Sequence, residues 1–486
     1  MRRQEDGIYC ICSMIDFLKK IFGISSGKPV TEPKKRGDAP VMGHAPAILQ
    51  VHEHGIDPAL VSKNAIRVVS TLQQAGYAAF IVGGAVRDLM LGETPKDFDV
   101  ATDATPEQVR RLFRRAFLIG RRFQIVHVRM GRDDLFEVTT FRGSSQKPAE
   151  VDASGRLLSD NTFGTQAEDA ARRDFTINAL YYNPTDQTLL DYHQGIRDLD
   201  SKTLRIIGDA EQRYREDPVR MLRVVRFAAK LGFTLDEATS APILQLRHLL
   251  DNIPAARLFD ETLKLLTSGH AMSCLEELRA YDLHGRLLPL LDEALSDQKA
   301  TRFIKTALER TDRRISDGRT VSPGFLFAVL LWPEVEAQWE VNQTKGEYPI
   351  PALVEAANTV LGRQTESLAI QRRIAVDMKD IWLLQPRLER RSGKSVFRLL
   401  ENPHFRAAYD FLLIRCEAGD LDAETGDWWK AFSAGSAEER QVLLESLSMR
   451  AAENSRSRKK RHRRKRRPSA SETIDSLPAD VPASAD

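Results

Sequence analysis

The 486-residue sequence predicts an α+β protein, with an N-terminal head built on a small mixed β-sheet and flanking helices, followed by all-α domains. Three observations predict this order. Ala79 to Val82 is a short apolar run typical of a buried strand, and helical spacing follows from Ala85 to Leu91. Residues 125–130 and 135–141 have the composition of two further strands. From Ile253 to about Trp332 the apolar spacing is helical throughout.

Composition limits the class of protein. A hydrophobic content of 42% indicates a globular chain, and the length predicts two to four domains. The four cysteines lack the spacing of a zinc site, which suits a reducing cytoplasm. No apolar run reaches the roughly 18 residues that a membrane span needs.

Both ends of the chain are predicted to lie outside the folded part. Residues 1–50 indicate a poorly ordered leader and linker. Within them residues 14–23 are amphipathic, so contact with a membrane surface or a partner is the weaker alternative. Between Arg456 and Arg467, ten of twelve residues are Lys or Arg, and removing these ten lowers the net charge from +3 to −7. Such a tail binds polyanions, although a purely solubilising tail is the alternative.

Two glycines follow the strand that ends at Val82. Gly83 and Gly84 allow a tight turn and close approach to a ligand, because they have no Cβ. Free amides and the positive end of a helix dipole meet at such a strand-to-helix corner, which favours a phosphate. An ordinary turn is the alternative.

Further on, Thr105 and Pro106 predict the start of a helix that extends to Phe117.

A pair of aspartates follows the glycines. If residues 96–101 form a strand, Asp97 and Asp99 project from one face. Two adjacent carboxylates repel each other, and a shared Mg²⁺ relieves the repulsion. The alternative is a solvated strand end. Glu137 lies in the middle of a predicted strand, either as a third functional carboxylate or as an edge-strand charge facing water.

Two later segments carry charged clusters. Residues 169–178 have helical spacing that places Asp174 and Asn178 on one face, with Arg173 beside them; read alone, this is a salt-bridged helix. Further on, Asp217 precedes Pro218 and is a plausible helix N-cap. Arginines at positions 220, 223 and 226 follow as a stripe.

Residues 333–350, with two prolines, indicate a connection between helical domains.

The run Gly83-Gly84-x-Val86-Arg87-Asp88, followed by Asp97-x-Asp99, resembles the head of the class II nucleotidyltransferase superfamily, which holds CCA-adding enzymes and bacterial poly(A) polymerases. The resemblance implies template-independent transfer of AMP from ATP to an RNA 3′-hydroxyl, with release of pyrophosphate, in RNA processing and decay. It also implies Mg²⁺, or Mn²⁺, as cofactor.

The resemblance also implies roles for single residues. Asp97 and Asp99 hold the metal and are catalytic, with Asp174 and Glu137 as the two candidates for a third functional carboxylate. The residues placed at the nucleotide are Gly83, Gly84, Arg87, Asp88, Arg173, Asn178, Asp217 and Arg220. Within this set, Asp217 and Arg220 contact the base edge, a role that their acceptor and donor groups suit.

Three features favour the poly(A) polymerase branch over the CCA-adding branch. Residues 118–128 and 394–412 resemble segments of bacterial poly(A) polymerases, and a basic tail suits unstructured RNA 3′ ends. The expected partners are RNA 3′ ends, ATP and RNA-decay proteins. A CCA-adding enzyme is the first alternative, and a non-catalytic RNA-binding protein is an alternative from another class.

The predicted domains follow from these segments. They are a leader and linker at 1–50, a catalytic head at 51–195, a neck for base recognition at 196–258, a helical body at 259–345, a helical RNA-binding domain at 346–453 and a basic tail at 454–486.

Overall fold

The computed structural model describes residues 45–120, 124–131, 134–143, 162–391, 393 and 395–449. The amphipathic segment 14–23, most of the predicted leader, and the basic tail lie outside the described residues. In the described part of the chain, none of the helices is both long and apolar enough to cross a bilayer.

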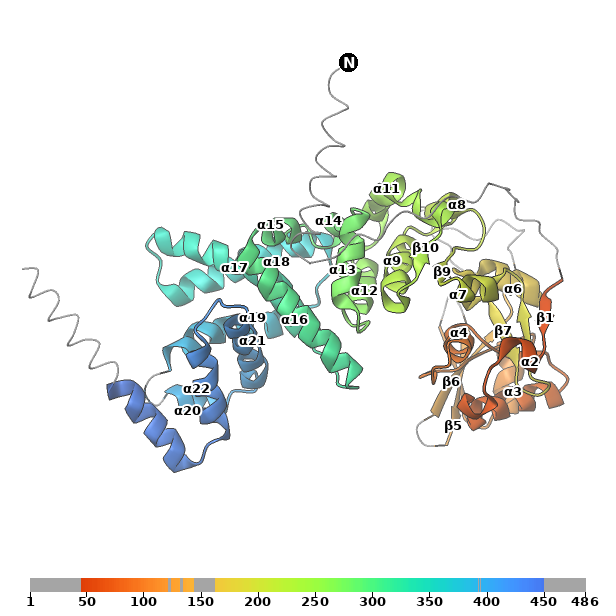
Figure 1. Ribbon diagram of the computed structural model, residues 1–486, viewed down its shortest axis with the longest axis horizontal. Helices are drawn as coiled ribbons and strands as arrows, with labels where there is room; N and C mark the ends of the chain where they lie inside the picture. Colours follow the sequence, from red (N-terminus) through yellow and green to blue (C-terminus); the bar gives the residue numbers. More distant parts are fainter. Residues whose placement is uncertain are drawn as a thin grey trace, which may run out of the picture. The chain divides into compact units, whose positions relative to one another are not determined.

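The head is built on an eight-stranded mixed sheet (Figure 1). Its strands, in spatial order, are β1 (Ala47–Leu49), β8 (Thr188–Asp191), β7 (Leu180–Asn183), β2 (Ala79–Val82), β3 (Asp99–Thr102), β6 (Asp134–Thr140), β5 (Ile125–Met130) and β4 (Ala116–Ile119). β3 and β6 run parallel, whereas β2 pairs antiparallel with β3 and β7. The α+β class is therefore confirmed, with more strands than predicted.

Short helices surround the sheet. They are α2 (Val51–His54), η1 (Pro58–Leu60), α3 (Lys63–Gln74), α4 (Gly84–Met90), α5 (Pro106–Leu112), α6 (Gln166–Arg172), η2 (Thr176–Asn178) and α7 (Gly195–Asp200). α3 packs against β2 and β3 through Val68, Val69 and Leu72, which are fully buried.

The helix predicted from Thr105 starts as expected but ends early. The Thr105 hydroxyl accepts from the Gln108 amide, and the Gln108 side chain accepts from the Thr105 amide. The predicted extension to Phe117 is wrong, because the helix ends at Leu112 and β4 follows. In β4, Phe117 and Ile119 are exposed, whereas Ala116 and Leu118 are half-buried. This alternation is the period-two pattern of a strand, and β4 lies at the edge of the sheet.

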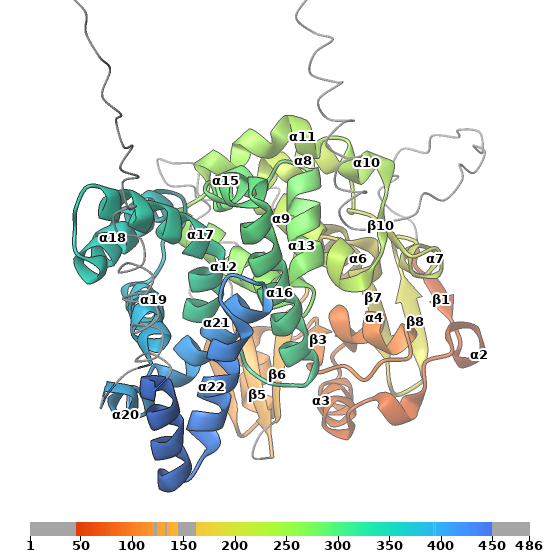
Figure 2. The ribbon, with the colours of Figure 1, turned by 60° about the vertical axis from the view of Figure 1, so that its left-hand side comes forward.

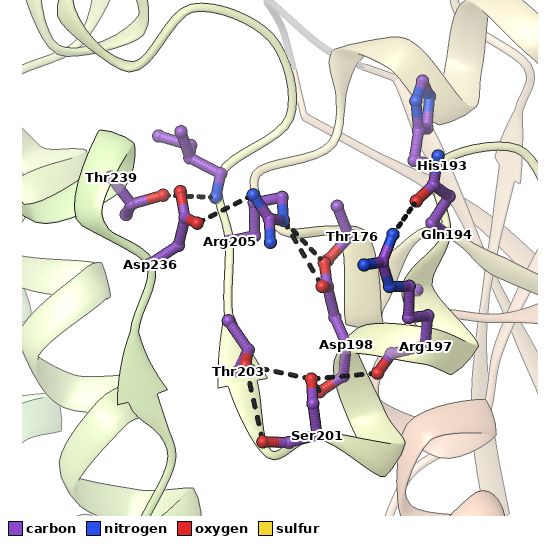
Figure 3. Close-up of polar contacts among 12 residues, drawn as sticks. Thr176, His193, Gln194, Arg197, Asp198, Ser201, Thr203, Arg205, Asp236 and Thr239 are labelled. Carbon is purple, nitrogen blue, oxygen red and sulfur yellow. Dashed lines mark hydrogen bonds and ion pairs between the residues drawn. The ribbon is translucent and has the colours of Figure 1, made fainter. Parts of the chain in front are cut away.

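A two-stranded parallel sheet, β9 (Thr203–Leu204) with β10 (Thr234–Leu235), lies in the region predicted to be an all-helical neck. Figure 3 shows how it is tied to the head. Arg205 donates to Asp198 at 3.1 Å and pairs with Asp236 at 2.8 Å, while the Thr176 hydroxyl donates to Asp198 at 2.7 Å. Because Asp198 is almost fully buried, this network holds the η2 turn firmly against β9.

The remainder is helical. Its elements are α8 (Ala210–Glu216), α9 (Val219–Leu231), α10 (Glu237–Ser240), α11 (Ile243–Leu246), η3 (Arg247–Asn252), α12 (Ala255–Leu266), α13 (Ala271–Ala280), α14 (His284–Leu287), α15 (Leu291–Ser296), α16 (Gln298–Ser316), α17 (Pro323–Thr344), α18 (Pro349–Ser367), α19 (Arg372–Arg390), α20 (Ser395–Leu400), α21 (Phe405–Glu417) and α22 (Ala423–Ala434), with residues 437–449 also helical. α9 packs against α12 and α13, and α21 against α22 (Figure 2).

One correction concerns the predicted connection at 333–350. α17 continues through Pro333 to Thr344, so only a short turn separates it from α18. Leu331, Trp332 and Val335 on either side of Pro333 are buried, and their packing offsets the backbone hydrogen bond that the proline removes. The predicted boundary between body and C-terminal domain falls in this turn, but α17 and α18 share one hydrophobic core.

Candidate active site

The strand-to-helix corner after β2 is formed by Gly83, which has φ of +74°. A side chain is strained in this left-handed region, so glycine is the natural residue here. A Cβ added at Gly83 would lie 3.4 Å from Nη1 of Arg173 and 3.8 Å from Oδ2 of Asp99. The corner therefore faces one guanidinium group and one carboxylate.

Asp97 and Asp99 project from the same face of their segment. Both are exposed, whereas Phe98 and Val100, which alternate with them, are buried. Asp99 is the first residue of β3, and Asp97 precedes the strand. In the sheet, Asp99 lies opposite Glu137 on the parallel strand β6. Three carboxylates thus gather beside the Gly83 corner.

The charges in this group affect one another. The Asp99 carboxylate is accessible to solvent but closely surrounded by protein. This desolvation is the main reason why the pKa of Asp99 is raised to about 6. The negative charge of Glu137 and, more weakly, that of Asp97 add to the rise, whereas the positive charge of Arg173 opposes it. A bound divalent cation would relieve this repulsion, and carboxylate oxygens are the ligands that Mg²⁺ prefers. In the described ranges, however, no three acidic, histidine or cysteine side chains are already arranged as a metal-binding group.

Glu137 is not on an edge strand, because β6 lies between β3 and β5. Its side chain is half exposed and lies 3.3 Å from Nε2 of His127, its cross-strand neighbour on β5. Phe136 and Val138 on either side of it are buried. Glu137 therefore shares the open face of the sheet with Asp99.

Arg173 is held in place by two residues that the sequence analysis did not single out. Its Nε donates to the Tyr181 hydroxyl at 3.1 Å, and its Nη2 donates to Asp169 at 3.1 Å. The Tyr181 hydroxyl donates in turn to Asp169 at 2.6 Å. Burial alone would lower the pKa of Arg173, but Tyr181 and Asp169 more than offset it, so the guanidinium stays charged. Only the four-residue spacing of Asp169 and Arg173 hinted at this group.

The continuous helix predicted for residues 169–178 is wrong. α6 ends at Arg172, Arg173 to Phe175 are extended, and the short turn η2 follows. Phe175 and Ile177 are completely buried, and Phe175 forms a β-bridge with Ile206, so alternating burial overrides the helical spacing. As a result, Asp174 and Asn178 contact different partners.

Asp174 faces the neck and not the other carboxylates. Its Oδ2 accepts from Nε of Arg223 on α9 at 2.7 Å. Asn178 instead accepts from Nη1 of Arg87 at 2.8 Å. Asp174 therefore links the head to the neck.

Arg87 is buried, with only 4% of its side chain exposed. It donates to Asp88 at 2.6 and 2.9 Å and to Asn178, and its guanidinium lies 5.6 Å from the ring centre of Phe227. Gly84 is packed against it, since an added Cβ would lie 3.5 Å from its Nη2. The donors of Arg87 are thus largely engaged within the protein.

The base-recognition candidates lie on the neck. The Asp217 carboxylate accepts from the Val219 amide at 3.3 Å and from Arg257 at 2.7 Å. Asp217 therefore caps the start of α9, although the residue directly before the helix is Pro218. Arg220 donates to Glu216 at 3.0 Å. The structure brings Asp97, Asp99, Glu137, Gly83 and Arg173 into one corner. Arg87, which is buried, forms a second group with the partly buried Asp88 and Asn178, while Asp174, Asp217 and Arg220 lie along the neck helices.

Three family models match the chain. They are described as the poly(A) polymerase head domain, over residues 79–205, a probable RNA- and SrmB-binding site of polymerase A, over 232–295, and the arginine-rich C-terminus of polymerase A, over 345–468.

Curated relatives agree with these models. The chain is 44% identical over 433 residues to poly(A) polymerase I of Escherichia coli O6:H1, covering 86% of this chain and 93% of that protein. It is also 44% identical to poly(A) polymerase I of Haemophilus influenzae, covering 82% and 90%. The CCA-adding enzyme of Bacillus subtilis is 40% identical but covers only 45% of this chain and 54% of its own length.

Solved structures show the same fold. The Bacillus stearothermophilus CCA-adding enzyme in complex with CTP is similar with a TM-score of 0.51 and 24% identity, covering 82% of this chain and 98% of that one. A tRNA-processing enzyme in its apo form has a TM-score of 0.55 at 21% identity, covering 80% and 97%.

The fold and the carboxylate-bearing glycine corner define a nucleotidyltransferase. Among such enzymes, relatives that match nearly the whole chain are those named poly(A) polymerase I, and the match includes the C-terminal helices. The chain belongs to the family of bacterial poly(A) polymerase I, which is related to the CCA-adding enzymes.

Proposed function

We propose that this protein polyadenylates RNA, transferring AMP from ATP to a 3′-hydroxyl without a template and releasing pyrophosphate. The observation that carries the proposal is the gathering of Asp99 and Glu137, side by side on parallel strands, with Asp97 on the same face and Gly83 beside them. Family membership over most of the chain supports polyadenylation over CCA addition, because the sequence match to the curated CCA-adding enzyme of Bacillus subtilis covers less than half of this chain.

We propose that Asp97 and Asp99 hold Mg²⁺, or Mn²⁺ in its place, with Glu137 as the third carboxylate. A metal held there would supply a lower pKa for the attacking hydroxyl and a counter-charge for the phosphates. The chain's own contribution is position. Glu137 is preferred to Asp174 because it lies directly beside Asp99, whereas Asp174 is paired with Arg223.

The phosphates of ATP are proposed to lie at the Gly83 corner. Arg173 is the cation best placed to contact them, because it lies beside Gly83 and is held by Tyr181 and Asp169. Arg87, Asp88, Asn178 and Gly84 are proposed to act by positioning, because the contacts of Arg87 join α4 to η2 and to Phe227.

The base of ATP is proposed to contact Asp217 and Arg220. A carboxylate accepts from an exocyclic amine, and a guanidinium donates to a ring nitrogen. Their present partners, Arg257 and Glu216, would then orient them.

We further propose that residues 232–295 take part in contacts with RNA and with proteins of RNA decay, a role supported by the family model over that range. The cysteine usage supports a cytoplasmic location.

One experiment separates the candidate functions. Purified protein is given a mixed-sequence RNA primer, Mg²⁺ and each nucleotide separately. Long tails from ATP alone are the expected result. A short addition to tRNA that needs CTP and then ATP would instead indicate a CCA-adding enzyme. No incorporation of any nucleotide would indicate a non-catalytic RNA-binding protein.

A further inference from the structure

A cavity of about 570 Å³ opens between α16, the turn before α17, and α21. Its volume lies within the range of about 300–1,000 Å³ that ligand sites occupy. Five arginines line it, and we call them the arginine trough: Arg310, Arg313, Arg314, Arg319 and Arg406. α16 runs alongside α21, as Figure 2 shows. A second cavity of about 480 Å³ shares Arg310 and Arg406 and continues toward α22.

The charges of the trough are only partly balanced. Arg310 pairs with Glu417 at 2.6 Å, Arg406 with Asp410 at 3.1 Å, and Arg319 with Asp317. The Arg313 guanidinium makes no hydrogen bond or ion pair with any described residue; the backbone carbonyl oxygen of Arg313 accepts from the Ser316 hydroxyl. Arg314 donates from Nε to the carbonyl oxygen of Thr320 at 2.8 Å and has no carboxylate partner in the same part of the chain.

Isolated surface arginines are common, but here five lie around one concavity and two of them, Arg313 and Arg314, have no carboxylate partner among the described residues. The only acidic residue among those lining the first cavity is Asp410, which already pairs with Arg406. A concave site with excess guanidinium groups favours a ligand with several phosphates, because each guanidinium can bind phosphate oxygens in a bidentate manner.

The shape and the aromatic residues point to a phosphodiester backbone. The two cavities share Arg310 and Arg406 in their linings, and two neighbouring concavities suit an extended strand better than one phosphate group. The rings of Tyr409 and Phe411 on α21 are buried, so they do not present a face on which bases could stack. Arginines are therefore the groups that this surface offers to a nucleic acid, and contact with phosphates does not depend on the base sequence.

We propose that the arginine trough binds the phosphodiester backbone of the single-stranded RNA substrate at a distance from its 3′ end. This inference rests on the proposed function for the identity of the RNA. The residues from Arg310 to Arg319 lie outside the three ranges that the family models match. The trough adds a second point of attachment for long RNA, separate from the catalytic corner.

The test compares two double variants of the full chain. Arg313→Ala/Arg314→Ala removes the two trough arginines that have no carboxylate partner. Arg372→Ala/Arg373→Ala removes an adjacent exposed pair at the start of α19, with the same change in net charge. Binding of a long and a short unstructured RNA is measured by fluorescence anisotropy over a range of salt concentrations, and thermal unfolding checks that both variants fold.

For the long RNA, the trough variant is expected to bind more weakly. The slope of log affinity against log salt should be less steep by about 1.4, since each lost phosphate contact on a single strand contributes about 0.7. The control variant should keep most of the wild-type slope. The gain in affinity from short to long RNA should shrink for the trough variant alone.

Equal slopes and affinities for the two variants would overturn the proposal. So would a trough variant that loses binding of millimolar inorganic phosphate but keeps the wild-type affinity for long RNA, because the site would then be one for small anions. These binding measurements require no catalysis. A wild-type protein that fails to incorporate AMP would therefore contradict the proposed function without affecting the test of the trough.

Discussion

Asp99 of β3 and Glu137 of β6 are direct neighbours in a parallel strand pair, and both side chains lie on the open face of the sheet. The pairing register determines this contact. A slip by one residue would turn Glu137 toward the core and a buried apolar residue toward Asp99. The acidic group is thus placed by the sheet itself, which is a more rigid support than a loop.

Replacement of either aspartate should remove catalysis. Asp97→Asn and Asp99→Asn keep the size of the side chain but remove the charge that attracts the metal. Incorporation of AMP should fall by on the order of 10²–10³-fold, as on loss of other strong electrostatic contacts in active sites. Primer extension with labelled ATP measures the rate, and RNA binding should remain as in the wild type. Extension at the wild-type rate by either variant would contradict the proposed roles.

Glu137 and Asp174 should differ in how their loss depends on metal concentration. Glu137→Gln is expected to raise the Mg²⁺ concentration needed for half-maximal activity, because its carboxylate lies beside Asp99. Asp174→Asn should leave this concentration unchanged. Its effect on stability should be coupled to that of Arg223→Ala by about 0.5–3 kcal/mol, as for other residues in contact. A shift of Mg²⁺ dependence in Asp174→Asn alone would reverse the two assignments.

The raised pKa of Asp99 predicts a pH dependence with a definite sign. The pKa is about 6 in the folded protein and 3.8 as the ordinary value, so without metal the folded state favours the protonated carboxyl. Its contribution to stability is present below the ordinary pKa and is lost as the pH rises through about 6. Mg²⁺ needs the ionised form, so its stabilising effect should grow over the same interval.

Melting temperatures with EDTA and with Mg²⁺, at about pH 5 and about pH 7, measure both effects. The Mg²⁺-induced shift should be larger at the higher pH in the wild type. In Asp99→Asn this difference should largely disappear. An equal Mg²⁺ shift at both pH values in the wild type would show that Asp99 does not control metal binding.

Arg87 should be sensitive to even a conservative replacement. Arg87→Lys keeps the charge but cannot reach Asp88 and Asn178 with the same fork of donors. Loss of hydrogen bonds from this buried charged group should lower the free energy of unfolding by about 1.5–3 kcal/mol. Urea unfolding measures this, with Arg372→Lys as an exposed control. A variant as stable as the wild type, but with weaker ATP binding, would indicate that Arg87 contacts the phosphates directly.

The basic tail should contribute to RNA binding through charge alone. Removal of residues 455–486 deletes the ten Lys and Arg residues of the run from Arg456 to Arg467. RNA affinity should fall mainly at low salt, with a shallower dependence on salt concentration, because fewer counterions are released. Unchanged binding at low salt would mean that the tail has another role.

Local patterns were sufficient to predict the elements that carry the site. The apolar run Ala79–Val82, the glycine corner and the capping sequence at Thr105 each depend on interactions within a few residues, and each was predicted correctly. The exposure of Asp97 and Asp99 on one face follows from the same two-residue period.

Long-range pairing caused the errors. The first two residues of β4, Ala116 and Phe117, are predicted as helix because the arginine-rich sequence around them masks a short alternation that only the pairing with β5 stabilises. Residues 173–175 are extended because Phe175 is drawn into the core beside Ile206. The partners of Arg87 and Asp174 lie 91 and 49 residues away. Spacing within one segment contains no information about such contacts.

The first described strand has a practical consequence for shortened versions of the protein. β1 covers β8 along three residue pairs, from Ala47 opposite Asp191 to Leu49 opposite Leu189. Proteins trimmed beyond residue 50 would lack β1 and would leave the backbone hydrogen-bonding groups of β8 unsatisfied. An exposed edge strand of this kind can pair with strands of other molecules. Crystallisation or activity trials on such trimmed proteins should therefore expect self-association, whereas trimming that stops before Ala47 leaves the rim covered.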